Sequence, residues 1–235
     1  MLVVLSGEGP SDLGRCDGSV FHPGPMAWMI DKLAEDRLGF SLVDTECIRL
    51  ISKQELAQTS KGLQPIKLPG KKSKKETGFY FRNARALAKK AREYLMEDSA
   101  IIAVLFRDAD GTASSGRGEW SDKYQSMING FRAERFDTGV PMIPKPKSEA
   151  WLLCALRRLP YENCGTLEQR SGNDDSPQSL KAELNVLLEG NDSAAAQAEL
   201  VHTGRVDCFR IGMPSYQAFR EALENTLEKV IHAPS

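Results

Sequence analysis

Acidic side chains follow two apolar runs of this sequence that are typical of buried strands. Glu8 and Asp12 follow the run LVVLS, and Asp108 and Asp110 follow the run AIIAVLF. Ligands of open α/β sheets bind outside the carboxyl ends of the strands. We therefore expect these four carboxylates to meet in one cleft. The alternative is that the first pair caps a helix and the second pair builds a turn.

A fifth acid, Glu149, follows a shorter predicted strand at 140–143. The i, i+2 spacing of Asp108 and Asp110 places both on the same side of an extended segment, where they can face one ion. Carboxylates packed together repel one another unless a divalent cation neutralises them. The three histidines are far apart, so this oxygen-only set suits Mg²⁺ or Mn²⁺ rather than zinc. The predicted metal ligands are Glu8, Asp12, Asp108, Asp110 and Glu149.

Strands and helices are predicted to alternate in the first two thirds of the chain. This order predicts an α/β fold, with a mainly parallel sheet between two layers of helices. We expect a core at 1–160 and a helical C-terminal extension at 161–235 packed on it. The predicted strands are 2–6, 46–51, 100–106 and 140–143, and the predicted helices are 23–36, 79–97, 119–134, 151–156, 176–188, 194–201 and 216–231, the last with Ser215 as N-cap.

Charge is unevenly distributed along the chain. The formal net charge is −1, but the segment 61–92 contains eleven Lys or Arg against one acid. Such a segment is the electrostatic footprint expected where a protein meets a polyanion, although a solvated lysine-rich loop has the same composition. We expect an irregular basic insertion at about 52–78, followed by a basic helix. The predicted nucleic-acid-binding residues are Lys71, Lys72, Lys74, Lys75, Arg82, Arg85 and Lys89.

Three aromatic residues, Phe79, Tyr80 and Phe81, stand beside these basic residues. Stacking on bases is one role for them, but Phe79 is interpreted as a core residue. Trp151, with the two leucines after it, and the apolar stripe of the last helix are likewise expected in the core.

Composition narrows the class of protein. The 235 residues are 41% hydrophobic and 27% charged, which excludes disordered and fibrous classes. The chain has no apolar run long enough for a membrane span and no leader pattern at its start, so we expect a cytoplasmic protein without a membrane partner. Five scattered cysteines without a CxxC pair argue against a disulfide framework and against zinc, and we interpret them as packing residues.

The order of the acidic motifs resembles the Toprim fold of topoisomerases, primases and OLD-type nucleases. That pattern is a strand, then Glu8-Gly-Pro-Ser-Asp12, then a distant strand ending in Asp108-Ala-Asp110. The chain is most similar to small stand-alone bacterial Toprim proteins of the RloB and OLD-like type. The narrower match lies in Pro144-Lys-Pro-Lys-Ser-Glu149-Ala-Trp151, Ser176-Pro-Gln-Ser-Leu-Lys181 and Met213-Pro-Ser-Tyr-Gln-Ala-Phe219.

This resemblance implies a metal-dependent nuclease in which two ions cleave a phosphodiester. Glu8 then ligates metal or acts as general acid or base, and Asp108 and Asp110 hold the metal. Asp12 and Glu149 assist a second ion, and Lys147 stabilises charge on the phosphorane, unless it is an exposed charge.

The resemblance also implies partners. Several such proteins are encoded beside ATPases in anti-phage defence loci, and this chain has no GxxxxGK[ST] element, so any ATPase is a separate protein. Nucleic acid is the implied substrate, with DNA favoured over RNA. The oligomeric state is left open by the sequence.

Two other functions compete with the nuclease. Asp108 and Asp110 also resemble the first motif of haloacid-dehalogenase phosphatases, in which the first Asp attacks phosphorus. That motif usually lies on the first strand, and the phosphatase leaves Glu8 and Asp12 unexplained. The other alternative is a Toprim-like binding subunit of a defence complex that does not catalyse.

Overall fold

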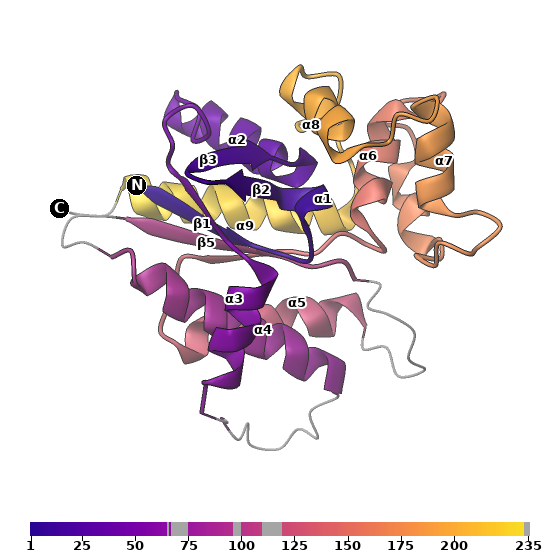
Figure 1. The fold of residues 1–235 in the computed structure, drawn as a ribbon. Helices are drawn as coiled ribbons and strands as arrows, with labels where there is room; N and C mark the ends of the chain where they lie inside the picture. The colour runs from indigo at the N-terminus through magenta and orange to yellow at the C-terminus, as the bar shows by residue number, and fades with distance from the viewer. Residues whose placement is uncertain (65, 67–74, 96–99, 110–118, 233–235) are drawn as a thin grey trace.

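The computed structural model describes residues 1–64, 66, 75–95, 100–109 and 119–232. Its centre is a parallel sheet in the order β4-β1-β5-β6 (Figure 1). The strands are β1 (Leu2–Ser6), β4 (Ile48–Ile51), β5 (Ile101–Phe106) and β6 (Gly139–Met142). The predicted α/β class and the parallel sheet are confirmed. β1 and β5 are direct neighbours, so the two acidic motifs leave the sheet side by side.

Helices cover both faces of this sheet (Figure 1). Side chains alternate along a strand, so Val3 and Leu5 enter one apolar core while Val4 enters the other. The first core is completed mainly by α2 (Pro25–Leu38) and α9 (Pro214–Ile231), and the second by α3 (Lys53–Lys61), α4 (Lys75–Arg92) and α5 (Trp120–Ala133).

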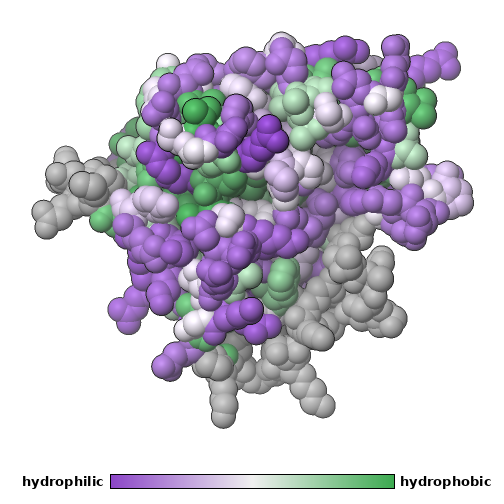
Figure 2. Space-filling model, in the orientation of Figure 1, coloured by the Kyte–Doolittle hydropathy of each residue, from purple (hydrophilic) through white to green (hydrophobic). Residues whose placement is uncertain are grey.

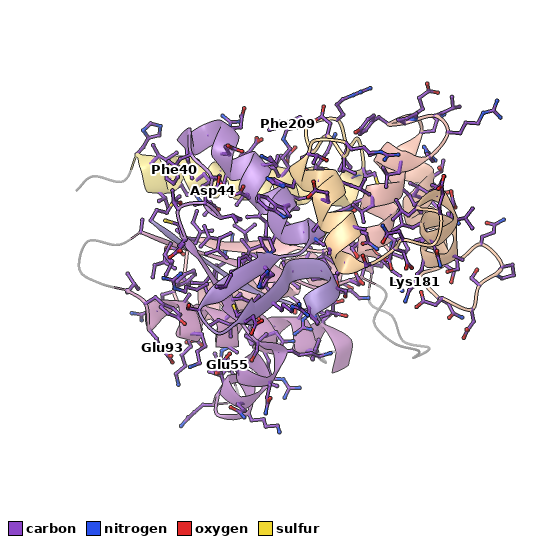
Figure 3. The ribbon with its side chains drawn as sticks, turned by 45° about the horizontal axis from the view of Figure 1, so that its top comes forward. Phe40, Asp44, Glu55, Glu93, Lys181 and Phe209 are labelled. Carbon is purple, nitrogen blue, oxygen red and sulfur yellow. A yellow bond between two sulfur atoms is a disulfide. The ribbon has the colours of Figure 1, made fainter. Side chains whose placement is uncertain are left out.

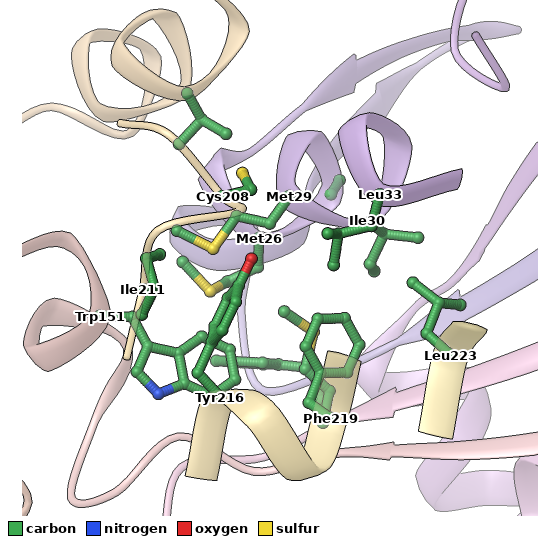
Figure 4. Close-up of a cluster of buried hydrophobic side chains, with 14 of the residues drawn as sticks. Met26, Met29, Ile30, Leu33, Trp151, Cys208, Ile211, Tyr216, Phe219 and Leu223 are labelled. Carbon is green, nitrogen blue, oxygen red and sulfur yellow. The ribbon is translucent and has the colours of Figure 1, made fainter. Parts of the chain in front are cut away.

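The first core contains the aromatic residues predicted to be buried. Tyr216, Phe219 and Leu223 of α9 face the apolar side of α2, with Trp151 beside them (Figure 4). The Trp151 ring lies 4.9 Å from that of Tyr216 and 5.8 Å from that of Phe219. The prediction of Ser215 as N-cap was wrong, because α9 begins one residue earlier and the Ser215 hydroxyl accepts a hydrogen bond from Trp151 Nε1.

Several short elements were not predicted. The chain leaves β1 through α1 (Pro10–Leu13) and enters a two-stranded antiparallel hairpin, β2 (Gly14–Asp17) and β3 (Val20–Pro23). Between β6 and α9, the helix η1 (Cys164–Gln169) was not predicted, whereas α6 (Ser148–Leu156), α7 (Leu180–Leu187) and α8 (Ala194–His202) correspond to the predicted helices at 151–156, 176–188 and 194–201.

The basic insertion at about 52–78 was predicted to be irregular, but it contains the helix α3. The helix begins at a capping box, in which Ser52 Oγ accepts from the Glu55 N–H and Glu55 Oε2 accepts from the Ser52 N–H. Leu56 anchors the helix in the second core.

The prediction that all cysteines are packing residues was wrong. Cys154 and Cys164 form a disulfide that joins the end of α6 to η1. Only Cys208 is a buried free thiol, whereas Cys16 is exposed and Cys47 half-buried. The partners are ten residues apart, and the turn after α6 brings their Cα atoms to 5.2 Å, which is within bridging range.

Hydrophilic side chains make up most of the described surface on the face shown in Figure 2. Phe40 and Asp44 lie on the α2 side of the molecule, and Glu55 and Glu93 lie on the α3–α4 side (Figure 3). Within the described residues, no helix combines the length and the apolar composition that crossing a membrane requires.

Candidate active site

The first acidic motif forms a tight loop and the short helix α1. Glu8 lies between Gly7 and Gly9, and its side chain is 38% exposed. Asp12 lies on α1, whose backbone packs closely against the start of α2. A Cβ atom on Gly24 would stand 2.3 Å from the Asp12 carbonyl oxygen, so only glycine allows this approach. The close packing fixes where Asp12 lies.

Asp108 follows β5 directly, and its backbone is held from two sides. Tyr80 Oη on α4 donates to the Asp108 carbonyl oxygen at 2.6 Å. The next N–H, that of Ala109, donates to the Pro144 carbonyl oxygen at 3.0 Å, and Lys123 Nζ on α5 donates to the Ala109 carbonyl oxygen. Helices of the second core thus position the turn that presents the acid.

Ser148, the first residue of α6, joins the two acidic motifs. Its backbone N–H donates to Asp108 Oδ1 at 3.0 Å, and its hydroxyl donates to Asp12 Oδ1 at 2.7 Å. Both contacts place a carboxylate at the N-terminus of a helix, where the peptide dipoles favour negative charge. One serine therefore draws together groups from the ends of two different strands.

The carboxylate of Asp108 is the centre of this cluster. Burial raises the pKa of Asp108 well above its ordinary value. The negative charges of Asp12, Glu149 and Glu8 raise it further, in that order, and the hydrogen bond from the Ser148 N–H acts in the opposite direction. Three of the other predicted acids therefore lie close enough to Asp108 to raise its pKa.

The pKa values of Asp12 and Glu149 are raised, as is that of Asp108. Burial raises the pKa of Asp12, and the hydrogen bonds from Ser148 and Ser11 offset only part of that rise. Burial also raises the pKa of Glu149, and the charge of Asp12 adds to the effect. Glu149 Oε2 is buried and has no hydrogen-bond partner among the described residues.

The site also contains two basic side chains. Lys147 Nζ contacts Asp174 Oδ1 at 2.6 Å. Burial lowers the pKa of Lys147, but the hydrogen bond to Asp174 and nearby carboxylates outweigh burial and leave that pKa above its ordinary value. Arg107, just before Asp108, is buried, and its Nη1 lies 3.7 Å from Glu8 Oε1.

The donor set is compatible with a hard divalent cation. All the acidic ligands offer oxygen, and the unpartnered Glu149 Oε2 is an atom whose burial an ion could compensate. In the part of the chain that the structure describes, no three acidic, histidine or cysteine side chains are close enough to hold an ion as they stand. Asp110, the remaining predicted ligand, lies outside that part, so the metal stays a prediction.

The predicted nucleic-acid surface is described only in part. Lys71, Lys72 and Lys74 lie outside the described residues, as does the side chain of Lys75, which begins α4. Arg82 and Lys89 are exposed on α4.

Arg85 is buried, unlike Arg82 and Lys89. Its Nε lies 2.6 Å from Glu134 Oε1, and its Nη1 donates to the Gln64 carbonyl oxygen at 2.8 Å. It therefore joins α4 to α5 and is not part of a surface.

The aromatic residues of α4 also differ from expectation. Phe79, interpreted as core, is 45% exposed, whereas Tyr80 and Phe81 are buried and cannot stack on a base as they stand. The apolar side of α4 is formed instead by residues such as Tyr80 and Leu87, which are buried in the second core.

Sequence analysis did not identify Arg107, Ser148, Tyr80 or Asp174 as members of the site. A signal existed for Arg107 and Ser148, since each is the immediate neighbour of a predicted acid. Tyr80 and Asp174 reach the site through long-range contacts that no local pattern indicates.

No protein-family model matches this chain, and neither a curated protein nor a solved structure matches it. The Toprim resemblance therefore depends on the motifs quoted above.

Proposed function

We propose that this protein is a metal-dependent phosphodiesterase acting on nucleic acid, with a Toprim-like site. The observation that supports the proposal best is the half-buried Asp108 carboxylate, which shares Ser148 with Asp12 and whose pKa is raised by the negative charges of Asp12, Glu149 and Glu8. Such crowding in a buried site is expensive unless a bound cation is part of the design. The first acidic motif follows β1 and the second follows its neighbour β5, as the Toprim pattern requires.

In this proposal, different side chains have different roles in phosphodiester cleavage. Asp108, Asp12 and Glu149 would hold the ion, together with Asp110. A bound Mg²⁺ or Mn²⁺ supplies an activated water and stabilises the leaving oxygen. Glu8, whose side chain is 38% exposed, is placed to exchange a proton with solvent or substrate. Lys147 offers positive charge to a phosphate once it is released from Asp174.

A cleavage assay tests the proposal. The purified chain is incubated with plasmid, linear DNA and RNA in Mg²⁺ or Mn²⁺, beside Asp108→Asn and the control Asp44→Asn. Asp44 is exposed and precedes β4, at the opposite end of the sheet from the site. We expect cleavage by the wild type and by Asp44→Asn, and a loss of at least about 100-fold in Asp108→Asn.

Cleavage that survives Asp108→Asn contradicts the proposal. Hydrolysis of a small phosphomonoester alone favours the phosphatase alternative, and binding of nucleic acid without cleavage favours the non-catalytic subunit.

A role in anti-phage defence with a separate ATPase is the broader part of this proposal. It depends on the Toprim resemblance alone. Co-purification of an ATPase with the tagged chain from its native host is the corresponding test, and cleavage that an added ATPase leaves unchanged argues against this part.

A further inference from the structure

Arg107 is a buried cation at the edge of the acidic site. Its side chain is 3% exposed, and its guanidinium lies 5.1 Å above the Phe79 ring. Its ion-pair partner is Glu8, with 3.7 Å between Nη1 and Oε1. Its Nε has no hydrogen-bond partner among the described residues. Burial lowers the pKa of Arg107, and the charges of Glu8 and Tyr80 act against that change.

A second buried arginine in the same protein shows what a stabilising arrangement looks like. Arg85 also lies over a phenylalanine, with 5.8 Å between its guanidinium and the Phe81 ring. Unlike Arg107, it has a carboxylate oxygen of Glu134 at 2.6 Å and a carbonyl oxygen of Gln64 at 2.8 Å. Buried charges stabilise a fold only when they are closely paired and hydrogen-bonded. Arg107 does not meet that condition, so its burial calls for a reason other than stability.

The reason lies in the loop that Arg107 touches. Glu8 stands between two glycines, and glycine places few restrictions on the backbone beside it. Burial and the Phe79 ring hold the Arg107 side chain in place. Arg107 can therefore fix the position of the Glu8 carboxylate, although the backbone on either side of Glu8 can adopt many conformations. The guanidinium is nearly inaccessible to solvent, so it meets substrate only through Glu8.

We propose that Arg107 is a positioning residue that holds the Glu8 carboxylate in place for phosphodiester cleavage. This inference rests on the proposed function. It predicts that the turnover number depends on Arg107 through Glu8, while the stability of the fold does not depend on it. The opposite holds for Arg85, which makes it the matched control.

The test compares Arg107→Met, Arg107→Lys, Arg85→Met, Glu8→Gln and the double variant Arg107→Met/Glu8→Gln. We expect Arg107→Met to lower kcat by about 10- to 100-fold, the loss expected when a catalytic group is misplaced. KM for nucleic acid should change less than about threefold, and Arg107→Lys should recover part of kcat. In the Glu8→Gln background, Arg107→Met should have no further effect.

Thermal unfolding separates positioning from a structural role. Replacing a poorly paired buried charge by an apolar side chain of similar length is neutral or stabilising, so Tm of Arg107→Met should equal or exceed that of the wild type. Arg85→Met should lower Tm, because it leaves Glu134 without its close partner.

Three results overturn the inference while the proposed function stands. They are an unchanged kcat in Arg107→Met, an undiminished effect of Arg107→Met in the Glu8→Gln background, and a fall in Tm as large as that of Arg85→Met. Absence of cleavage by the wild type, or cleavage that survives Asp108→Asn, overturns the proposed function and this inference together.

Discussion

At the scale of single residues, the site is held together by contacts between distant parts of the chain. The hydroxyl of Ser148 donates to Asp12, which lies 136 residues earlier. Sequence analysis identified Asp12, Asp108 and Glu149 because each follows a strand, but it did not identify the serine that connects the first two. Acid type and strand position are local information, whereas the pairing of Ser148 depends on how α6 docks on the sheet.

The raised pKa values of the carboxylates predict how stability depends on pH. Because folding raises the pKa of Asp108, Asp12 and Glu149, the folded protein binds more protons than the unfolded chain. The stability that these protons contribute is complete below the unfolded pKa of about 4 and is lost as pH rises through the raised values. Asn does not titrate, so Asp108→Asn should lose the part of this pH dependence that comes from position 108.

We therefore expect metal-free Asp108→Asn to melt at a higher temperature than the wild type at pH 8. The rise should be about 2 to 4 °C, which corresponds to about 1 kcal/mol in a chain of this size. The difference should shrink towards pH 4. Scanning calorimetry in a chelating buffer measures both. A constant difference between the two proteins at every pH would contradict the account.

At the scale of elements, the long apolar and amphipathic segments were predicted well. The runs that became β1 and β5 are apolar throughout, and α2 and α9 show helical spacing. The elements that were missed are short or polar. α1 has four residues, and α3 buries only one side chain, although its capping box could have identified it.

The exposed basic residues of α4 supply a prediction at this scale. Replacing Arg82 and Lys89 by Gln should weaken nucleic-acid binding. A plot of the logarithm of the binding constant against the logarithm of salt concentration should become shallower, by about 0.9 in slope per lost phosphate contact. The control is Lys181→Gln/Lys229→Gln, which removes the same charge from α7 and α9, and Lys181 is visible in Figure 3. Fluorescence anisotropy at several salt concentrations gives both slopes. Equal slopes for the two double variants would argue against a binding role for α4.

At the scale of the whole molecule, the C-terminal helix is part of the core that supports the sheet. Leu223 of α9 is fully buried beside α2, whereas Val186 of α7 is 77% exposed. Leu223→Ala should lower the free energy of unfolding by about 2 to 5 kcal/mol. Val186→Ala should change it by less than about 0.5 kcal/mol. Urea denaturation measures both, and similar values for the two variants would mean that α9 is not needed for the core.

The central claim is that carboxylates from separate strands gather around Asp108 to bind a divalent cation. Titration calorimetry with Mn²⁺ in metal-free buffer tests it most directly, because it needs neither a substrate nor a partner. The account predicts saturable binding by the wild type and by Asp44→Asn, and loss of that binding in Asp108→Asn. Heats of dilution alone in the wild type, or equal binding by Asp108→Asn, would contradict it.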